Sequence, residues 1–286
     1  MIKKILKDKF LILKIRNRFN PNVQISQRQL FHYYQDKVKQ KDVPSIIDTG
    51  FRVFSHQEED GKLLFIFSTI GMGNKTFIEI GSDDGVNSNA ANLIFNFGWH
   101  GLFIDGNKNS IKRGINFFKK YPTPFAHPPK FVLSKVTAEN INETIENAGF
   151  KKDIDFLSID IDGNDYWIWN ALSIINPKVV IIETHIEFGY NDIIVPYDAN
   201  YSYPGKHPVY HGASPTAMQK LGKKKGYRLV GGNELGYNFI FIRNGIADDL
   251  IPEVSVKSLI SHPSAIESFK KFESIRDWAY IKPIDE

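Results

Sequence analysis

The acidic residues of this chain gather at two places where predicted β-strands end. The stretch DIDFLSIDIDGNDYWIW, residues 153–169, contains Asp160 and Asp162 after a strand-like run, and the next apolar run, VVIIETH, ends with Glu183 and His185. If both strands run in the same direction, these four side chains converge at one edge of a sheet. Carboxylates and an imidazole at such an edge are suited to general acid–base or metal chemistry.

Two kinds of chemistry fit this set of residues. Asp160 and Glu183 offer the oxygen ligands that Mg²⁺ or Mn²⁺ prefers, and a divalent ion would lower the pKa of an acceptor hydroxyl. Alternatively, Asp162 or His185 acts as a general base without a metal and removes the proton of an attacking hydroxyl. The catalytic candidates are therefore Asp160, Asp162 and His185. A structural role, in which the carboxylates accept bonds from loop N–H groups, stays open beside both.

A glycine loop follows the first predicted strand. In FIEIGSDDGVNSN, Glu79 lies in the strand, and Gly81, Ser82 and Gly85 belong to the turn into a predicted helix. Loops of this kind let the backbone approach a nucleotide-type ligand closely. We expect all four residues, together with Asp160, to contribute to binding that ligand.

The composition of this loop argues against a pyrophosphate ligand. The loop lacks the third glycine of the G-x-G-x-x-G pattern, and Glu79, Asp83 and Asp84 would repel phosphate charges. These acids suit S-adenosylmethionine, which carries a sulfonium and an ammonium group and no phosphate. Asp105 ends the second predicted strand, GLFID, about 20 residues beyond the glycines, where an acid accepts hydrogen bonds from ribose hydroxyls.

The segment KVTAENI follows the third predicted strand and is a second candidate for contact with the same ligand. Ala138 and Glu139 are expected to lie beside the adenine ring. Residues 137–140 fit a helix cap equally well, because Thr and Asn are common capping residues.

These motifs lie on an alternating pattern of predicted strands and helices. Strand-like runs at residues 76–80, 101–105, 130–136, 154–160 and 179–184 alternate with helix-like stretches at 88–97, 110–120, 141–148 and 165–174. Such alternation predicts an α/β fold with a doubly wound, mostly parallel sheet and helices on both faces. A helix that begins at Pro215 and two further strands, at 227–230 and 238–243, complete the pattern as a hairpin-like ending.

Three polar segments lie outside this pattern. Residues 187–210 form a long loop rich in Tyr, Pro, Asn and Asp, and long loops in compact domains are usually functional. Residues 55–61 and 210–214 are expected either to fold over the site as lids or to remain solvated loops.

The chain resembles the FkbM-like group of class I methyltransferases at the segments FIEIGSDDGVNSN, GLFIDGN, KVTAENI, DIDFLSIDIDGNDYWIW and VVIIETH. The resemblance covers roughly residues 50–245. It implies a Rossmann-like seven-stranded sheet, S-adenosylmethionine as methyl donor, and O-methylation of a sugar, another glycan or a natural-product hydroxyl. Glu79, Gly81 and Gly85 match the family's first motif, and Asp105 matches its ribose-binding acid. Asp160 and Asp162 match its D-x-E-G segment, in which Asp162 replaces the more usual Glu and shortens the reach.

The two ends of the chain extend beyond the resemblance. We expect a basic helical extension at residues 1–45, an S-adenosylmethionine-binding methyltransferase domain at 46–250 and a helical tail at 251–286. Residues 1–18 contain seven Lys or Arg and one acid, with apolar side chains at Ile2, Ile5, Leu6, Phe10, Leu11 and Leu13. This segment is expected to touch an anionic membrane or a second subunit, or to pack on its own domain.

The overall composition excludes several other classes of protein. The absence of cysteine from the 286 residues excludes disulfides and thiolate metal sites, and it suits a reducing cytoplasm. No apolar run approaches the roughly 20 residues of a membrane span. The net charge of +4 is modest, and no Arg-rich stripe interleaved with aromatic residues indicates nucleic-acid binding.

Two other functions stay open. An NAD(P)-type oxidoreductase has a similar sheet but requires the glycine pattern that this loop lacks. A non-catalytic S-adenosylmethionine-binding module would keep the sheet without the chemistry. The motifs do not identify the acceptor, whether a sugar, a glycan or another small molecule.

Overall fold

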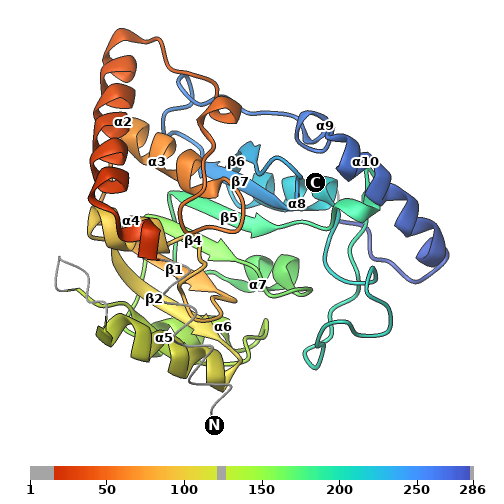
Figure 1. Cartoon of the computed structure of the whole chain (residues 1–286). Coiled ribbons are helices and arrows are strands. Elements are labelled where there is room, and N and C mark those ends of the chain that lie inside the picture. Colours follow the sequence, from red (N-terminus) through yellow and green to blue (C-terminus); the bar gives the residue numbers. More distant parts are fainter. Residues whose placement is uncertain (1–15, 121–126, 284–286) are drawn as a thin grey trace.

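The computed structural model describes residues 16–120 and 127–283, and within them seven strands form one sheet (Figure 1). The strands are β1 (Thr76–Ile80), β2 (His100–Asp105), β3 (Lys130–Leu133), β4 (Phe156–Ile159), β5 (Val179–Glu183), β6 (Tyr227–Gly232) and β7 (Asn238–Arg243). Their order is β3-β2-β1-β4-β5-β7-β6. The first five strands pair in parallel, and β7 pairs antiparallel with both β5 and β6. The predicted doubly wound, mostly parallel seven-stranded fold, the Rossmann-like arrangement of class I methyltransferases, is thereby confirmed.

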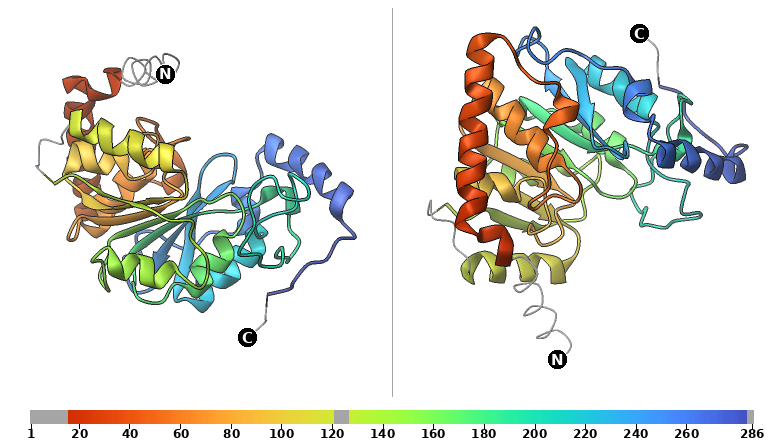
Figure 2. Two further views of the ribbon diagram at one scale, coloured as in Figure 1. Left: turned by 90° about the horizontal axis from the view of Figure 1, so that it is seen from below. Right: turned by 45° about the horizontal axis from the view of Figure 1, so that its top comes forward.

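Helices cover both faces of this sheet (Figure 2). One face carries α3 (Glu59–Ile70), α4 (Ala91–Phe97) and α5 (Lys108–Lys120), and the other carries α6 (Ile141–Asn147), α7 (Asp165–Ala171) and α8 (Pro215–Lys224). Because successive side chains of a strand point to opposite faces, each strand contributes to two separate cores. Phe77 and Phe103 pack in the first core, whereas Ile78 and Leu102 pack in the second.

The strand order fixes where a ligand can bind. From β1 the chain moves outward through β2 and β3, then returns to place β4 on the other side of β1. In an open α/β sheet, the crevice beyond the carboxyl ends of the strands at such a reversal is the usual ligand site. The segments that follow β1, β2, β3, β4 and β5 are those with the predicted functional residues.

Before the sheet, the described residues form η1 (Arg16–Phe19), α2 (Pro21–Gln40) and η2 (Ile46–Thr49). Asn20 caps α2, and Pro21 occupies its first turn. The helix packs on α3 and is tied to α4 by the hydrogen bond from Asn92 Nδ2 to Gln27 Oε1, 2.7 Å. The predicted helical extension therefore includes α2, while the apolar positions between Ile2 and Leu13 lie outside the described residues.

The C-terminal part contains α9 (Val256–Leu259), α10 (Pro263–Ser268) and η4 (Phe269–Ile275) beyond the sheet. Within the described ranges, no helix has both the length and the apolar character that crossing a bilayer requires. The domain limits at residues 45 and 250 stay predictions.

Residues 55–61 form a turn that leads into α3, and the exposed His56 of this turn lines the cavity beyond the carboxyl ends of the strands. Ser55, Glu59 and Asp60 are buried, and α3 already begins at Glu59. The carboxylate of Asp60 accepts backbone N–H groups of residues 53, 54 and 55 and so fixes the turn that enters the helix. The polar side chains of this segment thus belong to a hydrogen-bonded turn. Polarity in the sequence does not by itself distinguish such a turn from a solvated loop.

Candidate functional site

A cavity of about 840 Å³ opens beyond the carboxyl ends of the central strands. This volume lies within the roughly 300–1,000 Å³ typical of ligand sites. Its walls come from the ends of β2 and β5, from the loops after β1, β2, β3 and β4, from the turn before α3 and from a short stretch of the long polar loop. The lining residues are His56, Gly81, Asp83, Ile104, Asp105, Gly106, Asn107, Ser134, Lys135, Val136, Asp160, Ile161, Asp162, Asn164, Glu183, Tyr201, Ser202 and Tyr203.

Gly81 begins the glycine loop at the cavity wall. The backbone N–H groups of Gly81 and Ser82 both donate to the carbonyl oxygen of Ile104, at 2.9 and 3.2 Å. Gly81 has φ +82°, and a Cβ there would lie 1.6 Å from the carbonyl oxygen of Asp160. Only glycine fits this position, so the loop after β1 lies directly against the loop after β4.

Glu79 does not line the cavity. It instead fixes the chain that follows the glycine loop. Its buried carboxylate accepts hydrogen bonds from Ser88 Oγ at 2.9 Å and from the backbone N–H groups of Asn89 and Ala90 at 3.1 and 3.0 Å. Burial raises the pKa of Glu79 to about 7, although these three donors favour the charged form. The carboxylate therefore ties β1 to the segment that leads into α4.

The two other acids of the loop are paired within the protein. Arg113 of α5 donates to Asp83 at 2.9 Å and to Asp84 at 2.5 Å. Much of the negative charge that the sequence places in this loop is therefore neutralised by a residue 29 or 30 positions away. Attraction for a cationic ligand must come chiefly from the carboxylates beyond β4 and β5.

Asp105 lies at the end of β2 and lines the cavity, as its predicted role requires. Its oxygens accept the backbone N–H groups of Asp83 at 2.8 Å and Asn107 at 2.6 Å. An ionised carboxylate has about four lone-pair sites, so these two bonds orient the group and leave acceptor capacity for a ligand.

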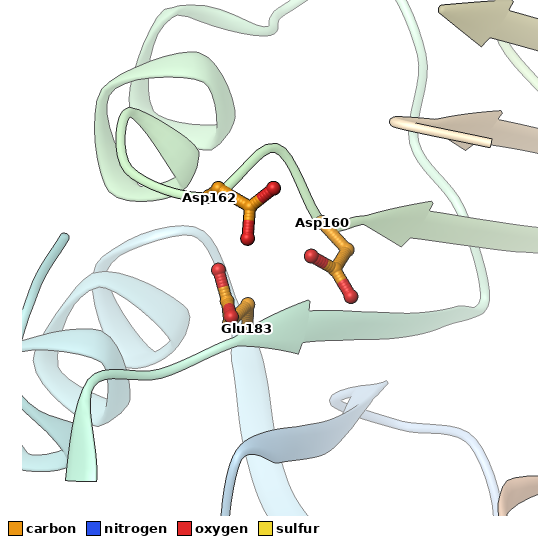
Figure 3. A group of neighbouring side chains, drawn as sticks. All are labelled: Asp160, Asp162 and Glu183. Atoms are coloured by element: carbon orange, nitrogen blue, oxygen red, sulfur yellow. The ribbon is translucent and has the colours of Figure 1, made fainter. Parts of the chain in front are cut away.

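Asp160, Asp162 and Glu183 form a compact carboxylate cluster, shown in Figure 3. One oxygen from each side chain lies within 4.8 Å of the other two. Burial and the neighbouring acids Asp165 and Asp162 raise the pKa of Asp160, and burial beside Asp160 raises that of Glu183. This concentration of negative charge destabilises the ionised state of the empty protein and favours a cation or a hydrogen-bond donor.

Asp165 fixes the loop on which Asp162 lies. Its buried carboxylate accepts the backbone N–H groups of Ile161 at 2.8 Å and Gly163 at 2.9 Å. Asp162 itself has φ +56° and is exposed to the cavity. The dense acidic sequence thus contains one carboxylate that organises the loop and others that face the ligand space.

His185 does not line the cavity that the carboxylate cluster lines. Its Nε2 lies 2.7 Å from the carbonyl oxygen of Val209, and its ring packs against His211 and Phe188. Burial lowers the pKa of His185 to about 4, so the ring is neutral. These contacts indicate a structural role, in which His185 bonds the carbonyl of a loop residue.

Gly85, Ala138 and Glu139 do not line the cavity. A Cβ at Gly85 would approach the ring of Phe103 to 2.7 Å, so this glycine permits close packing. The N–H of Ala138 donates to Tyr197 Oη at 2.9 Å, and Tyr197 donates to Glu139 at 2.6 Å. The buried hydroxyl of Ser82 has no hydrogen-bond partner.

Several cavity residues were not predicted from the sequence. Lys135 and Val136 extend the wall beyond β3, which ends at Leu133 and is shorter than expected. Tyr201 and Tyr203 enter from the long loop, whose richness in tyrosine was the available signal. No local pattern indicates which residues of such a loop face inward.

Comparisons with known proteins give a likeness of fold only. No family model and no curated protein matches the chain. An S-adenosylmethionine-dependent methyltransferase from Aquifex aeolicus is 12% identical, with a TM-score of 0.39 over 72% of this chain and 96% of that one. An O-methyltransferase from Bacillus cereus, in complex with S-adenosylhomocysteine, is 15% identical, with a TM-score of 0.42 over 73% and 89%. Mitomycin 7-O-methyltransferase is 13% identical, with a TM-score of 0.37 over 76% and 67%.

Proposed function

We propose that the protein is an S-adenosylmethionine-dependent O-methyltransferase of the FkbM-like kind, acting on a hydroxyl of a sugar, a glycan or a natural product. The observation that carries the proposal is one cavity lined by Gly81, by Asp105 and by the carboxylate cluster of Asp160, Asp162 and Glu183. The methyl donor requires a glycine turn, an acceptor for its ribose hydroxyls and carboxylates that attract its positive charge.

The residues of the cavity fit the donor in three respects. Asp105 is oriented by two backbone N–H groups and keeps acceptor capacity for ribose hydroxyls. Ile104 and Val136 supply apolar surface for a heterocyclic ring. When bound, S-adenosylmethionine supplies an electrophilic methyl group on a positively charged sulfur, and the carboxylate cluster favours that charge.

Asp162 is the preferred candidate for the general base. It is exposed to the cavity, whereas His185 is buried and bonded to Val209. A carboxylate that removes the acceptor proton as the bond to the methyl carbon forms would contribute to the rate as general bases do. Alignment of acceptor and donor in one cavity supplies the remaining requirement.

A divalent cation is a second candidate for activation of the acceptor. Asp160, Asp162 and Glu183 offer converging oxygen ligands, which fit Mg²⁺ or Mn²⁺. Such an ion would lower the pKa of an acceptor hydroxyl. Asp162 would then be a ligand instead of a base.

The NAD(P)-type alternative is less compatible with this cavity. Although Arg113 neutralises Asp83 and Asp84, the three carboxylates of the cluster line the same space, and their charge opposes a pyrophosphate. A non-catalytic binding module would bind the donor without transferring its methyl group. A cytoplasmic location, and contact with a membrane or a second subunit through the N-terminal segment, stay predictions.

Asp105→Ala tests the donor site. Loss of charge-assisted hydrogen bonds to the ribose, worth about 1.5–3 kcal/mol, should weaken S-adenosylhomocysteine binding by about tenfold to a hundredfold. Calorimetric titration of the wild type and the variant measures this change, and the thermal midpoint verifies folding. Asp277→Ala, an exposed acid outside the cavity, is the matched control. Equal affinity of Asp105→Ala and wild type would exclude this ribose site.

A further inference from the structure

Part of the long polar loop lines one side of the cavity. Residues 195–212, here called the roof loop, contain no helix or strand and run beside α7 (Figure 1). The base of the roof loop is closed by the hydrogen bond from Val195 N to the carbonyl of Gly212, 2.9 Å. Tyr201, Ser202 and Tyr203 of this loop line the cavity together with Gly81 and Asp105.

The roof loop is attached at both sides of the site. On the β3 side, Tyr197 bonds the backbone N–H of Ala138. On the β4 side, Asn164 Nδ2 donates to the carbonyl of Asp198 at 2.9 Å, and Gly212 N donates to that of Gly163 at 2.9 Å. The loop therefore bridges the segments that follow two different strands.

Tyr201 is the side chain that fits most closely into the β4 side. A Cβ at Gly163 would lie 2.4 Å from Tyr201 Cε1, and one at Gly205 would lie 2.6 Å from Tyr201 Cε2. The ring also stacks on His211, with 6.2 Å between ring centroids and 29° between their planes. Two glycines thus leave just enough space for this ring.

Packing of the ring holds Tyr201, and hydrogen bonding does not. The Tyr201 hydroxyl is buried and has no hydrogen-bond partner. Removal of a hydroxyl without a partner costs little, whereas removal of the ring empties the space between Gly163 and Gly205. Phenylalanine at this position should therefore keep the packing of the ring, whereas alanine should lose it.

We propose that Tyr201 is a positioning residue that keeps the roof loop closed over the bound methyl donor and so limits the rate at which the donor product leaves. The inference rests on the proposed donor site. Closure of loops over a ligand commonly excludes water and controls release. Tyr201 acts here through the roof loop and the Asp162–Gly163 segment against which its ring lies.

The test is the dissociation rate of S-adenosylhomocysteine, measured by stopped-flow displacement with excess unlabelled ligand. Tyr201→Ala should release it about tenfold faster, which corresponds to about 1.4 kcal/mol of lost packing. Tyr201→Phe should stay within about twofold of the wild type, since the ring remains. Tyr190→Ala, a half-exposed tyrosine outside the cavity, should release the ligand at the wild-type rate.

Hydrogen exchange separates closure from general destabilisation. In Tyr201→Ala, amides of residues 195–212 should lose protection in the ligand-bound state while those of β1 and β4 keep theirs. Gly205→Ala, which would push a methyl group against the ring and strain a backbone with φ +59°, should have the same effect with Tyr201 present. Wild-type release from Tyr201→Ala, or equal acceleration in Tyr201→Phe and Tyr201→Ala, overturns the inference but leaves the donor site intact. A wild-type protein that does not bind S-adenosylhomocysteine overturns both.

Discussion

Asp162→Asn is expected to lower methyl-transfer turnover by about 10²- to 10⁴-fold, the usual contribution of a general base. Asparagine has nearly the same shape but cannot accept the acceptor proton. Because Asp162 is exposed to the cavity and bonds none of the groups that fix the glycine loop, S-adenosylhomocysteine affinity should change little. Initial rates with methyl-labelled donor, measured against a panel of methyl glycosides and phenols, give the turnover.

His185→Gln is the matched control for that experiment. His185 bonds Val209 and packs on Phe188, so its replacement should reduce the thermal midpoint and leave turnover within a few-fold of the wild type. The opposite result, with turnover lost in His185→Gln and kept in Asp162→Asn, would make the histidine the base.

Asp160→Asn is expected to stabilise the empty protein and to weaken its affinity for the methyl donor. Burial and the charges of Asp165 and Asp162 raise the pKa of Asp160 from 3.8 to about 8. Since the folded state holds this proton more tightly than the unfolded state, the free energy of unfolding falls as the pH rises between these values. The substitution should therefore increase the free energy of unfolding at pH 8, and should do so less at pH 5.

Chemical unfolding at pH 5 and pH 8 measures this effect, and Asp277→Asn is an exposed control. Affinity for S-adenosylmethionine should fall more than affinity for S-adenosylhomocysteine, because only the former carries the sulfonium charge that the cluster attracts. A destabilised Asp160→Asn protein with unchanged affinity for both ligands would show that the cluster is not a cation-binding surface.

The same variant distinguishes the metal from the metal-free mechanism. If the cluster holds an ion, Mn²⁺ should raise the thermal midpoint of the wild type and leave that of Asp160→Asn unchanged. EDTA should then abolish turnover, and Mg²⁺ or Mn²⁺ should restore it. Full activity in excess EDTA excludes the metal and leaves Asp162 as the base.

The sheet could be predicted because its signals are local. Short apolar runs such as FIEI and VVII alternate with amphipathic stretches, and β1, β2, β4 and β5 each end at, or directly before, a glycine or an acid. The convergence of Asp160, Asp162 and Glu183 followed from the parallel direction of β4 and β5, which the alternation itself implies.

Contacts between residues far apart in the sequence could not be predicted from these local signals. Arg113 is 29 positions from Asp84, and nothing in the sequence around either residue indicates their ion pair. The same holds for Tyr201, which fits against Gly163 only after the roof loop has folded back. The predicted repulsion of pyrophosphate by Asp83 and Asp84 is therefore weaker than their sequence suggested.

His185 illustrates a second limit. Residues that follow a strand were expected to continue towards the cavity, but the chain enters η3 (Ile186–Phe188) directly after His185. The turn directs the imidazole to the carbonyl of Val209, while Glu183 two residues earlier lines the cavity. The direction of a side chain beyond the last paired residue depends on the turn that follows, which the sequence pattern does not define.

Calorimetric titration of the wild-type protein with S-adenosylmethionine, S-adenosylhomocysteine and NAD⁺ tests the central claim most directly. Asp105, Gly81 and the carboxylate cluster line one cavity, so we predict saturable micromolar binding of the first two ligands and no binding of NAD⁺. Saturable binding of NAD⁺, with no heat from either adenosyl ligand at millimolar concentration, would contradict the assignment of this cavity to a methyl donor.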